Sequence, residues 1–307
     1  MWGRERYIDQ KVRTISAFLQ NEWKNEKWSL LVGGRLDKHS MLDKPVFSPR
    51  ANLRFNPTED ISLRASYSFG FRAPQAFDED LHIDNVGGTV SMIQLAEDLK
   101  EEKSQSISLS ADMYHNWGDW QGNLLLEGFY TNISDVFALT EIGKDQNGVI
   151  INERGNEKGA YVCGCTLEGK LAWRNVWQFQ AGFTLQKAEY KEARSWSDDD
   201  PNIPLEKRMF RTPDGYGYFT MTYNPLQSLT LALSGTYTGN MLVEHHKGYI
   251  KENRTEKTPD FFDMGFKAAY DFKLYKSITL QVNAGVQNIF NAYPVSYTHL
   301  TLPTILL

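Results

Sequence analysis

The stretch "SLRASYSFGFRAPQAFDED", residues 62–80, decides the fold class. From residue 61 to residue 69 apolar and polar side chains alternate with a period of two. The apolar set is Ile61, Leu63, Ala65, Tyr67 and Phe69. Such alternation is typical of a β-strand with one apolar and one polar face. The strand ends in Gly-Phe-Arg-Ala-Pro and an acidic cluster, where we expect a long polar loop.

The same alternation recurs along the chain of 307 residues. Clear examples are "NVWQFQAGFTLQ" (175–186), "SLTLALSGTYTG" (228–239) and "SITLQVNAGVQN" (277–288). The pattern predicts roughly twelve strands, each close to the ~9–11 residues that a tilted membrane strand needs. No apolar run approaches the roughly 20 residues of a spanning helix, which excludes helical membrane anchoring. A membrane β-barrel remains possible, because its strands alternate and keep the mean hydropathy low.

The connections between these strands alternate between tight turns and long polar stretches. We expect the long ones at 37–46, 70–103, 134–158, 188–212 and 239–258. Short turns on one rim and long loops on the other are typical of an outer-membrane barrel. Tryptophans flank several tight turns, as expected for an aromatic girdle at a membrane interface. They are Trp23, Trp28, Trp117, Trp120, Trp173 and Trp177.

The polar faces of the predicted strands are too hydrophilic for the core of a soluble sandwich. They suit a lumen that holds water or a plug. The residues that indicate this are Arg50, Asn52, Arg54, Arg64, Asn123, Glu127, Gln178 and Gln180.

The charge distribution and the lack of catalytic motifs in the sequence argue against several classes of function. The net charge of -5, with acids and bases interspersed, leaves no basic footprint for nucleic acid. "GCTLEGK" (164–170) has the spacing of a phosphate-binding loop, but Leu171 follows it and it lies on a predicted strand. Cys163 and Cys165 are interpreted as small apolar residues of a strand face. We find no catalytic constellation, and we expect neither an enzyme nor a bound cofactor or metal.

A few loop residues are candidates for ligand binding. Phe71, Arg72 and Phe77 begin the long loop, where the arginine could meet an anionic ligand or pack at the rim. His245 and His246 could ligate iron or zinc, although no second cluster of ligands supports them.

Two further loop features are weaker as ligand sites. The acidic runs at 78–80 and 197–202 are interpreted as solvated loops rather than Ca²⁺ sites. Apolar residues with helical spacing predict a short loop helix, namely Met92, Ile93, Leu95, Ala96 and Leu99.

Taken in order, several segments resemble the barrel of TonB-dependent outer-membrane receptors. A strand followed by "GFRAP" and an acidic loop is the first such segment. Others include "TISAFLQNEWK", "FSPRANLRFNPTED", "KGAYVCGCTLEGKL" and "LQVNAGVQNIFNAYP". The likeness covers nearly all of residues 11–294, and it rests on the order of the segments rather than on any one of them.

The resemblance implies an all-β, antiparallel transmembrane β-barrel, of which about twelve of the family's 22 strands lie in this chain. It also implies energy-coupled uptake of a scarce nutrient, with an iron-siderophore foremost and haem, cobalamin or a sugar as other cargoes. The implied partners are outer-membrane lipid, a small-molecule chelate, and the inner-membrane TonB complex acting through a plug. The implied location is the outer membrane of a Gram-negative bacterium.

The sequence also predicts how the chain is divided. We expect residues 1–294 to be the C-terminal part of the receptor barrel, without plug or closing strand and with open edges. We expect residues 295–307, "VSYTHLTLPTILL", to be a non-native tail, since their composition continues no upstream pattern. Two alternatives stay open: a passive porin-type outer-membrane barrel, and a soluble all-β binding module.

Overall fold

The structure, a computed structural model, describes residues 11–74, 91–146, 148, 150–196, 203–245 and 251–293. These residues form strands and connections without helices. The strands are β1 (Thr14–Lys24), β2 (Trp28–His39), β3 (Val46–Thr58), β4 (Ile61–Arg72), β5 (Ser91–Leu95), β6 (Glu102–Trp117), β7 (Trp120–Ser134), β8 (Val136–Lys144), β9 (Ile150–Glu157), β10 (Ala160–Trp173), β11 (Trp177–Arg194), β12 (Glu206–Arg208), β13 (Gly215–Leu226), β14 (Leu229–Thr238), β15 (Leu242–His245), β16 (Arg254–Lys257), β17 (Phe261–Tyr275) and β18 (Ile278–Val286). Within the described ranges, no helix is long and apolar enough to cross a membrane.

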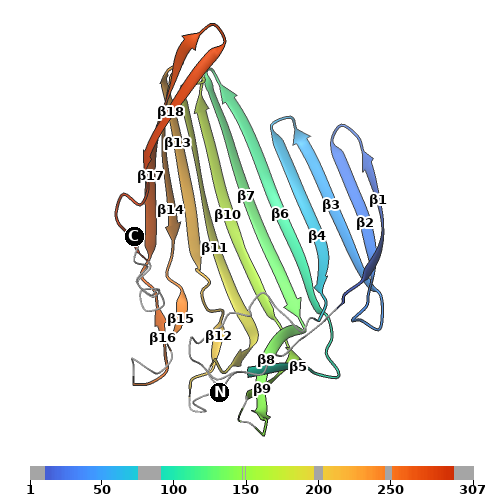
Figure 1. Cartoon of the computed structure of the whole chain (residues 1–307). Coiled ribbons are helices and arrows are strands. Elements are labelled where there is room, and N and C mark those ends of the chain that lie inside the picture. The colour runs from blue at the N-terminus through green and yellow to red at the C-terminus, as the bar shows by residue number, and fades with distance from the viewer. Residues whose placement is uncertain are drawn as a thin grey trace.

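Twelve long strands form one antiparallel sheet in the order β1-β2-β3-β4-β6-β7-β10-β11-β13-β14-β17-β18, and β12 adds to β11 (Figure 1). The predicted all-β class and the expected number of strands are therefore confirmed. Each long strand pairs with its neighbours along the chain, as in a meander. Among the described strands, β1 and β18 each pair on one side only, so the sheet is open.

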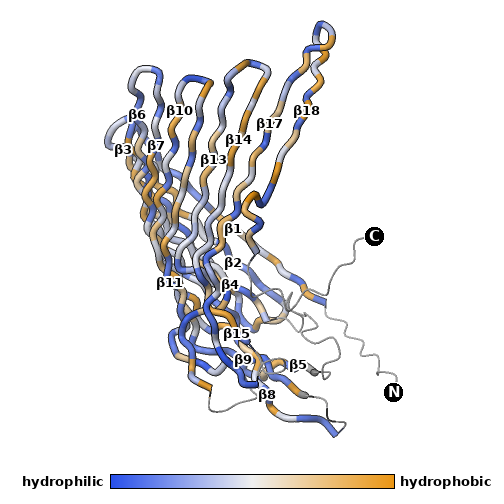
Figure 2. Tube along the Cα trace, turned by 90° about the vertical axis from the view of Figure 1, so that its left-hand side faces the viewer, coloured by the Kyte–Doolittle hydropathy of each residue, from blue (hydrophilic) through white to orange (hydrophobic). Residues whose placement is uncertain are grey.

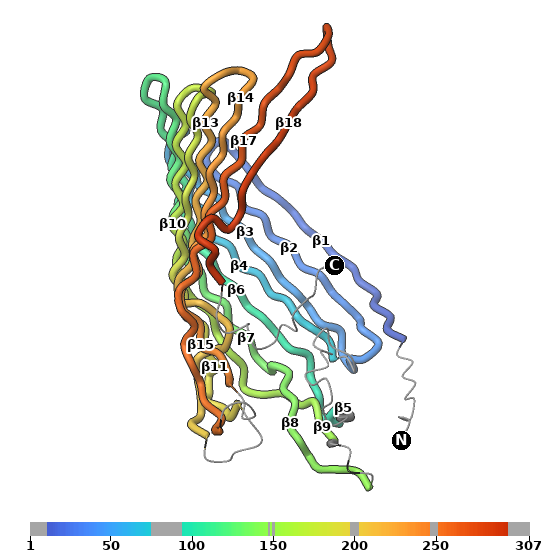
Figure 3. Tube along the Cα trace, turned by 60° about the vertical axis from the view of Figure 1, so that its left-hand side comes forward, coloured from blue at the N-terminus to red at the C-terminus, as the bar shows by residue number. Residues whose placement is uncertain are grey.

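The sheet is strongly curved, and its two faces differ in chemistry. Figure 3 shows the strands from β1 to β18 wrapping around a concave side. Along the strands hydrophobic and hydrophilic residues alternate (Figure 2), so one face is apolar and the other polar. Large apolar side chains of the convex face are exposed, among them Leu109, Leu167, Phe183 and Val282. In water such a surface would be unfavourable, whereas in a bilayer it is the surface that faces lipid.

The tight turns all lie at one end of the sheet, the upper end in Figure 1. Five of the six tryptophans predicted to flank them begin or end strands β2, β6, β7, β10 and β11 at this rim, and Trp23 is the last residue but one of β1. Several stack across strands: the ring centroids of Trp28 and Phe55 are 4.1 Å apart, as are those of Trp177 and Tyr223. Aromatic pairs thus recur along this rim, as expected for one interface of the membrane.

One ion pair joins two of the tight turns. Arg174, with φ of 49°, donates from Nη2 to Asp119 Oδ2 at 2.6 Å and thereby links the β10–β11 turn to the β6–β7 turn. The hydrogen bond from Arg174 holds the pKa of the Asp119 carboxyl below its ordinary value. Both side chains are exposed, so the pair positions the turns and adds little to stability.

The long connections lie at the opposite rim and contain strands that the sequence did not indicate. β8 and β9 form a hairpin, and β5 adds to β9 in parallel from Ser91 opposite Ile150 to Leu95 opposite Arg154. The predicted helix over residues 92–99 is therefore wrong. A pattern this short cannot distinguish helix from strand, and here the pairing with β9 decides. β11 also continues through Arg194, into the stretch predicted as loop.

Glycines on the convex face let aromatic rings lie flat against the neighbouring strand. A Cβ added at Gly235 would lie 2.3 Å from Phe219 Cε1, and one at Gly217 would lie 2.7 Å from Phe183 Cδ2. At Gly217 the added Cβ would also lie 2.6 Å from the backbone oxygen of Gly182, which cannot move without disturbing the ladder. Gly217 is therefore required by close packing.

We expect Gly217→Ala to destabilise the protein by about 1–3 kcal/mol, the usual cost of overpacking. Gly128→Ala is the matched control, because a Cβ at Gly128, also on the convex face, meets nothing within 4 Å. The measurement is the urea midpoint of the detergent-solubilised protein, read from the folded band in a gel run without heating. Equal midpoints for the two variants would contradict the close contact at Gly217.

Candidate functional site

The concave face collects the polar residues that the sequence predicted for a lumen. The register places Arg54 opposite Arg64, Asn123 opposite Lys170 and Glu127 opposite Thr166, so that these side chains share one face of the sheet. Gln180 lies opposite Lys170 on the next strand and joins the same face. Six strands from β3 to β11 thus present polar groups toward the inside of the curve.

One polar cluster on this face joins three strands. The Tyr218 hydroxyl of β13 donates to Glu168 Oε2 of β10 at 2.7 Å. Gln180 of β11 donates from Nε2 to Glu168 Oε1 at 3.1 Å and to the Tyr218 hydroxyl at 2.7 Å. Lys170 Nζ lies 3.1 Å from Glu168 Oε1. The carboxylate of Glu168 is the acceptor at the centre of the cluster, and it is held in one place by three donors.

A second cluster lies on β6 and β7. Asn123 Nδ2 donates to Asp112 Oδ1 at 2.5 Å, and the Tyr114 hydroxyl donates to Asp112 Oδ2 at 3.1 Å. Arg64 of β4 approaches the same carboxylate at 3.9 Å. Asp112 is 8% exposed and is therefore almost fully occupied by groups of this chain.

Pairs of hydroxyl groups bridge neighbouring strands on the same face. Pairs of side-chain oxygens lie within hydrogen-bond distance on neighbouring strands: Ser66 and Ser108 at 2.7 Å, Ser106 and Thr131 at 2.9 Å, and Thr166 and Thr184 at 2.9 Å. Each hydroxyl is both donor and acceptor, so the surface can bind water or a polar protein surface. The concave face is built to contact polar material rather than lipid.

The loop candidates at the long-loop rim have different surroundings. The guanidinium carbon of Arg72, at the end of β4, lies 5.1 Å from the ring centre of Phe137 in β8, a cation–π contact. Phe71 packs with Phe69 against a small buried cluster of Leu42, Val46 and Ala73. Arg72 is thus held at the rim by an aromatic ring, whereas Phe71 contributes to packing there.

The histidine candidates stand apart from this group. His245 ends β15, and its Nε2 lies 3.6 Å from Glu256 Oε2 of β16. His246 and Phe77 fall outside the described residues, as do the acidic runs at 78–80 and 197–202. In the ranges that the structure describes, no group of three or more His, Cys, Asp or Glu side chains could hold a metal ion.

Sequence reasoning missed the residues that position Arg72. Phe137 lies in β8, inside a stretch predicted to be loop, and its backbone N–H donates to Glu102 Oε2 at 3.1 Å. The loop sheet is also tied to the connection that leads into β6, where Asn156 Oδ1 accepts from Lys100 N at 2.7 Å. The alternation in "VFALTEIGK" (136–144) was the available signal, but its partner strands could not be read from it.

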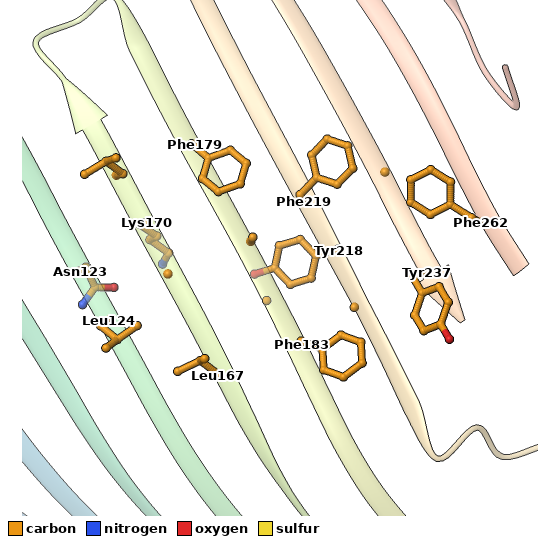
Figure 4. A pocket seen from close by; sticks show the side chains of 16 residues that line it. Asn123, Leu124, Leu167, Lys170, Phe179, Phe183, Tyr218, Phe219, Tyr237 and Phe262 are labelled. Carbon is orange, nitrogen blue, oxygen red and sulfur yellow. The ribbon is translucent and has the colours of Figure 1, made fainter. Parts of the chain in front are cut away.

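A hollow on the convex face is shown in Figure 4. It is lined mainly by apolar side chains of β7, β10, β11, β13, β14 and β17, including Leu167, Phe179, Phe183 and Phe219, and the lining also includes Asn123, Lys170 and Tyr218, which the register assigns to the concave face. Because this face is apolar, the hollow faces lipid and not the lumen.

These features together define a class of protein: an antiparallel membrane β-barrel with a polar lumen, short turns on one rim and elaborated loops on the other. The chain belongs to the family of TonB dependent receptor-like β-barrels, whose model matches residues 3–289. The resemblance seen in the sequence is therefore confirmed. Among curated protein sequences, none matches the chain significantly.

Solved structures with the same fold include three iron-related receptors. A mutant of the ferric enterobactin receptor PfeA from Pseudomonas aeruginosa superposes with a TM-score of 0.65 at 17% identity, over 91% of this chain and 40% of that one. The siderophore receptor PirA from Acinetobacter baumannii superposes with a TM-score of 0.62 at 17% sequence identity, over 91% of this chain and 42% of PirA. The FrpB iron transporter from Neisseria meningitidis superposes with a TM-score of 0.65 at 17% sequence identity, over 92% of this chain and 42% of FrpB. The chain thus spans about two fifths of these receptors, and the likeness shows the fold.

We expect Tyr218→Phe to lower the free energy of unfolding by about 1 kcal/mol, because it removes a hydrogen bond to Glu168 that solvent partly screens. Tyr216→Phe is the control: Tyr216 lies on the same strand and face, and the structure shows no hydrogen bond from its hydroxyl. Urea unfolding of both variants gives the comparison. A Tyr218→Phe midpoint equal to that of Tyr216→Phe would show that the cluster adds nothing to stability.

Proposed function

We propose that this chain is the barrel wall of a TonB-dependent outer-membrane receptor that imports a scarce nutrient, with a ferric siderophore as the first candidate. The observation that carries the proposal is the polar concave face on a sheet whose convex face is apolar. The match to the family of TonB dependent receptor-like β-barrels over residues 3–289 favours a receptor over a passive porin-type barrel, which would share the polar lumen. The titles of the similar structures, which name siderophore receptors and an iron transporter, support iron as the cargo.

The proposal assigns a role to each part of the wall. The lumen face holds a plug domain, which contacts the inner-membrane TonB complex and is moved by it. The remaining strands of the receptor pair with the free sides of β1 and β18, because unpaired backbone groups are not tolerated in lipid. The domain corresponds to residues 1–294, in the outer membrane of a Gram-negative bacterium. No step of this function requires the chain to act as an enzyme.

The long-loop rim supplies the barrel's share of the ligand site. Arg72 is the foremost candidate there, because its guanidinium is held against Phe137 at the rim and carries the positive charge that an anionic chelate would pair with. Phe71, Phe77, His245 and His246 belong to the same rim by position. Haem, cobalamin and sugar chelates remain the other cargoes that such a rim could bind.

The test is uptake of radioactive iron, offered as a set of ferric siderophores, by cells in which this receptor is the only route. We expect binding at the cell surface with or without TonB, but accumulation only when TonB and the proton-motive force are present. Equal accumulation with and without TonB would contradict energy coupling.

The same cells test the rim. We expect Arg72→Gln to weaken surface binding of the transported chelate roughly ten-fold, the effect of losing one charge-assisted hydrogen bond. Arg174→Gln, at the short-turn rim on the other side of the membrane, is the matched control and should bind normally. Unchanged binding by Arg72→Gln would remove this residue from the site.

A further inference from the structure

Three arginines lie on the lumen face of two neighbouring strands. Arg54 of β3 (Val46–Thr58) and Arg64 of β4 (Ile61–Arg72) lie near the short-turn rim, whereas Arg50 lies four residues further along β3, toward the long-loop rim. The register places Arg54 directly opposite Arg64, on the same side of the sheet. All three side chains are exposed toward the lumen, and that of Arg64 is 54% exposed.

This arrangement is unfavourable for the sheet alone. Directly opposite side chains have Cβ atoms about 4.5–5.5 Å apart, and like charges at such positions destabilise a sheet. A carboxylate between them would remove the repulsion, but the nearest ion-pair partner, Asp112, lies 3.9 Å from Arg64 and already accepts from Asn123 and Tyr114. Within the described part of the chain, Arg50 and Arg54 form no ion pair and no side-chain hydrogen bond.

The neighbours of the arginines are mostly hydrogen-bond donors without charge. Arg50 lies opposite Ser68, and Asn52 lies between the two arginines of β3, opposite Ser66. On the other side Arg54 lies opposite Ser29, whose hydroxyl donates to Glu22 Oε1 at 2.7 Å. Glu22 and Asp112 therefore flank the group on its two sides, and both already accept hydrogen bonds. The surface between them offers guanidinium, amide and hydroxyl groups to an oxygen-rich anion.

We propose that Arg50, Arg54 and Arg64 form an anion-binding site on the lumen wall, running from the middle of β3 toward the periplasmic end, for a polycarboxylate or similarly oxygen-rich anionic chelate. The planar guanidinium forks can bind carboxylate oxygens in pairs, and the hydroxyl and amide groups complete the contacts. The inference rests on the proposed function: Arg54 and Arg64 lie toward the end of the lumen where cargo leaves, and Arg50 lies further along β3 toward the ligand-binding rim. It gives a released anion an intermediate stop on the way to the periplasm.

The test is electrical and uses citrate as the probe. The full-length receptor is placed in a planar bilayer in urea that displaces the plug, and citrate is added on the short-turn side. We expect citrate to block the ion current of the wild type. In the double variant Arg50→Gln/Arg54→Gln the concentration for half block should rise at least ten-fold. The matched control, Lys267→Gln/Lys273→Gln, removes two positive charges from the same face of β17 and should be blocked like the wild type.

Three outcomes would overturn the site. One is equal block of the wild type and the arginine double variant, and another is an equal loss of block in the lysine control. The third is an ion current through the arginine double variant in the absence of urea, combined with citrate block equal to that of the wild type. This result would mean that the substitutions loosen the plug, and it would assign the arginines to contacts with the plug. Arg54→Lys, which keeps the charge but loses the fork, should be blocked at an intermediate concentration, and it remains informative if the double variant does not fold.

The result is independent of the uptake experiment. If citrate blocks as expected but cells accumulate no iron, the anion site stands and the proposed cargo fails. If uptake depends on TonB but the arginine variant is blocked like the wild type, the proposed function stands and the anion site fails.

Discussion

The structure depends on one constraint: in lipid, every backbone N–H and C=O must find its partner within the protein. The twelve long strands satisfy it by antiparallel pairing with their neighbours along the chain. That pairing imposes a period of two, so each strand presents one face to lipid and one to the lumen. Leu167 and Glu168, adjacent in β10, illustrate the result: the first is exposed on the convex face, and the second is bound by three donors on the concave face.

The same meander produces two different rims: one with tight turns and one with long connections. Tight turns at one end keep neighbouring strands in register, and stacked pairs such as Trp177 and Tyr223 anchor that end at the membrane interface. The other end is free to carry long insertions, and these fold into small sheets of their own, one of which brings Phe137 against Arg72. Polar groups that could bind a ligand therefore lie on the surfaces that lipid does not cover, in the lumen and in the loops.

Much of this could be predicted from the sequence because its information is local. The alternation from Trp177 to Leu185 identifies a strand and both of its faces, and the tryptophans beside tight turns identify a membrane rim. Contacts between segments distant in the chain could not be predicted in this way. The strand at Ser91–Leu95 forms because it pairs with β9. The hydrogen bond from Tyr218 to Glu168 depends on the register of β10, β11 and β13. Both require knowledge of which strands meet, which a single sequence does not contain.

The central claim is that the two faces of this sheet contact lipid and lumen, respectively. Spin labels along β11 test it most directly, in a receptor whose Cys163 and Cys165 have been replaced by serine. The measured quantity is the ratio of collisions with a water-soluble nickel reagent to collisions with oxygen, which concentrates in lipid. This ratio should be low for labels at Phe179 and Leu185 and higher for labels at Gln178 and Gln180. Equal ratios at all four positions would contradict the account, because the sheet would then have no lipid-facing side.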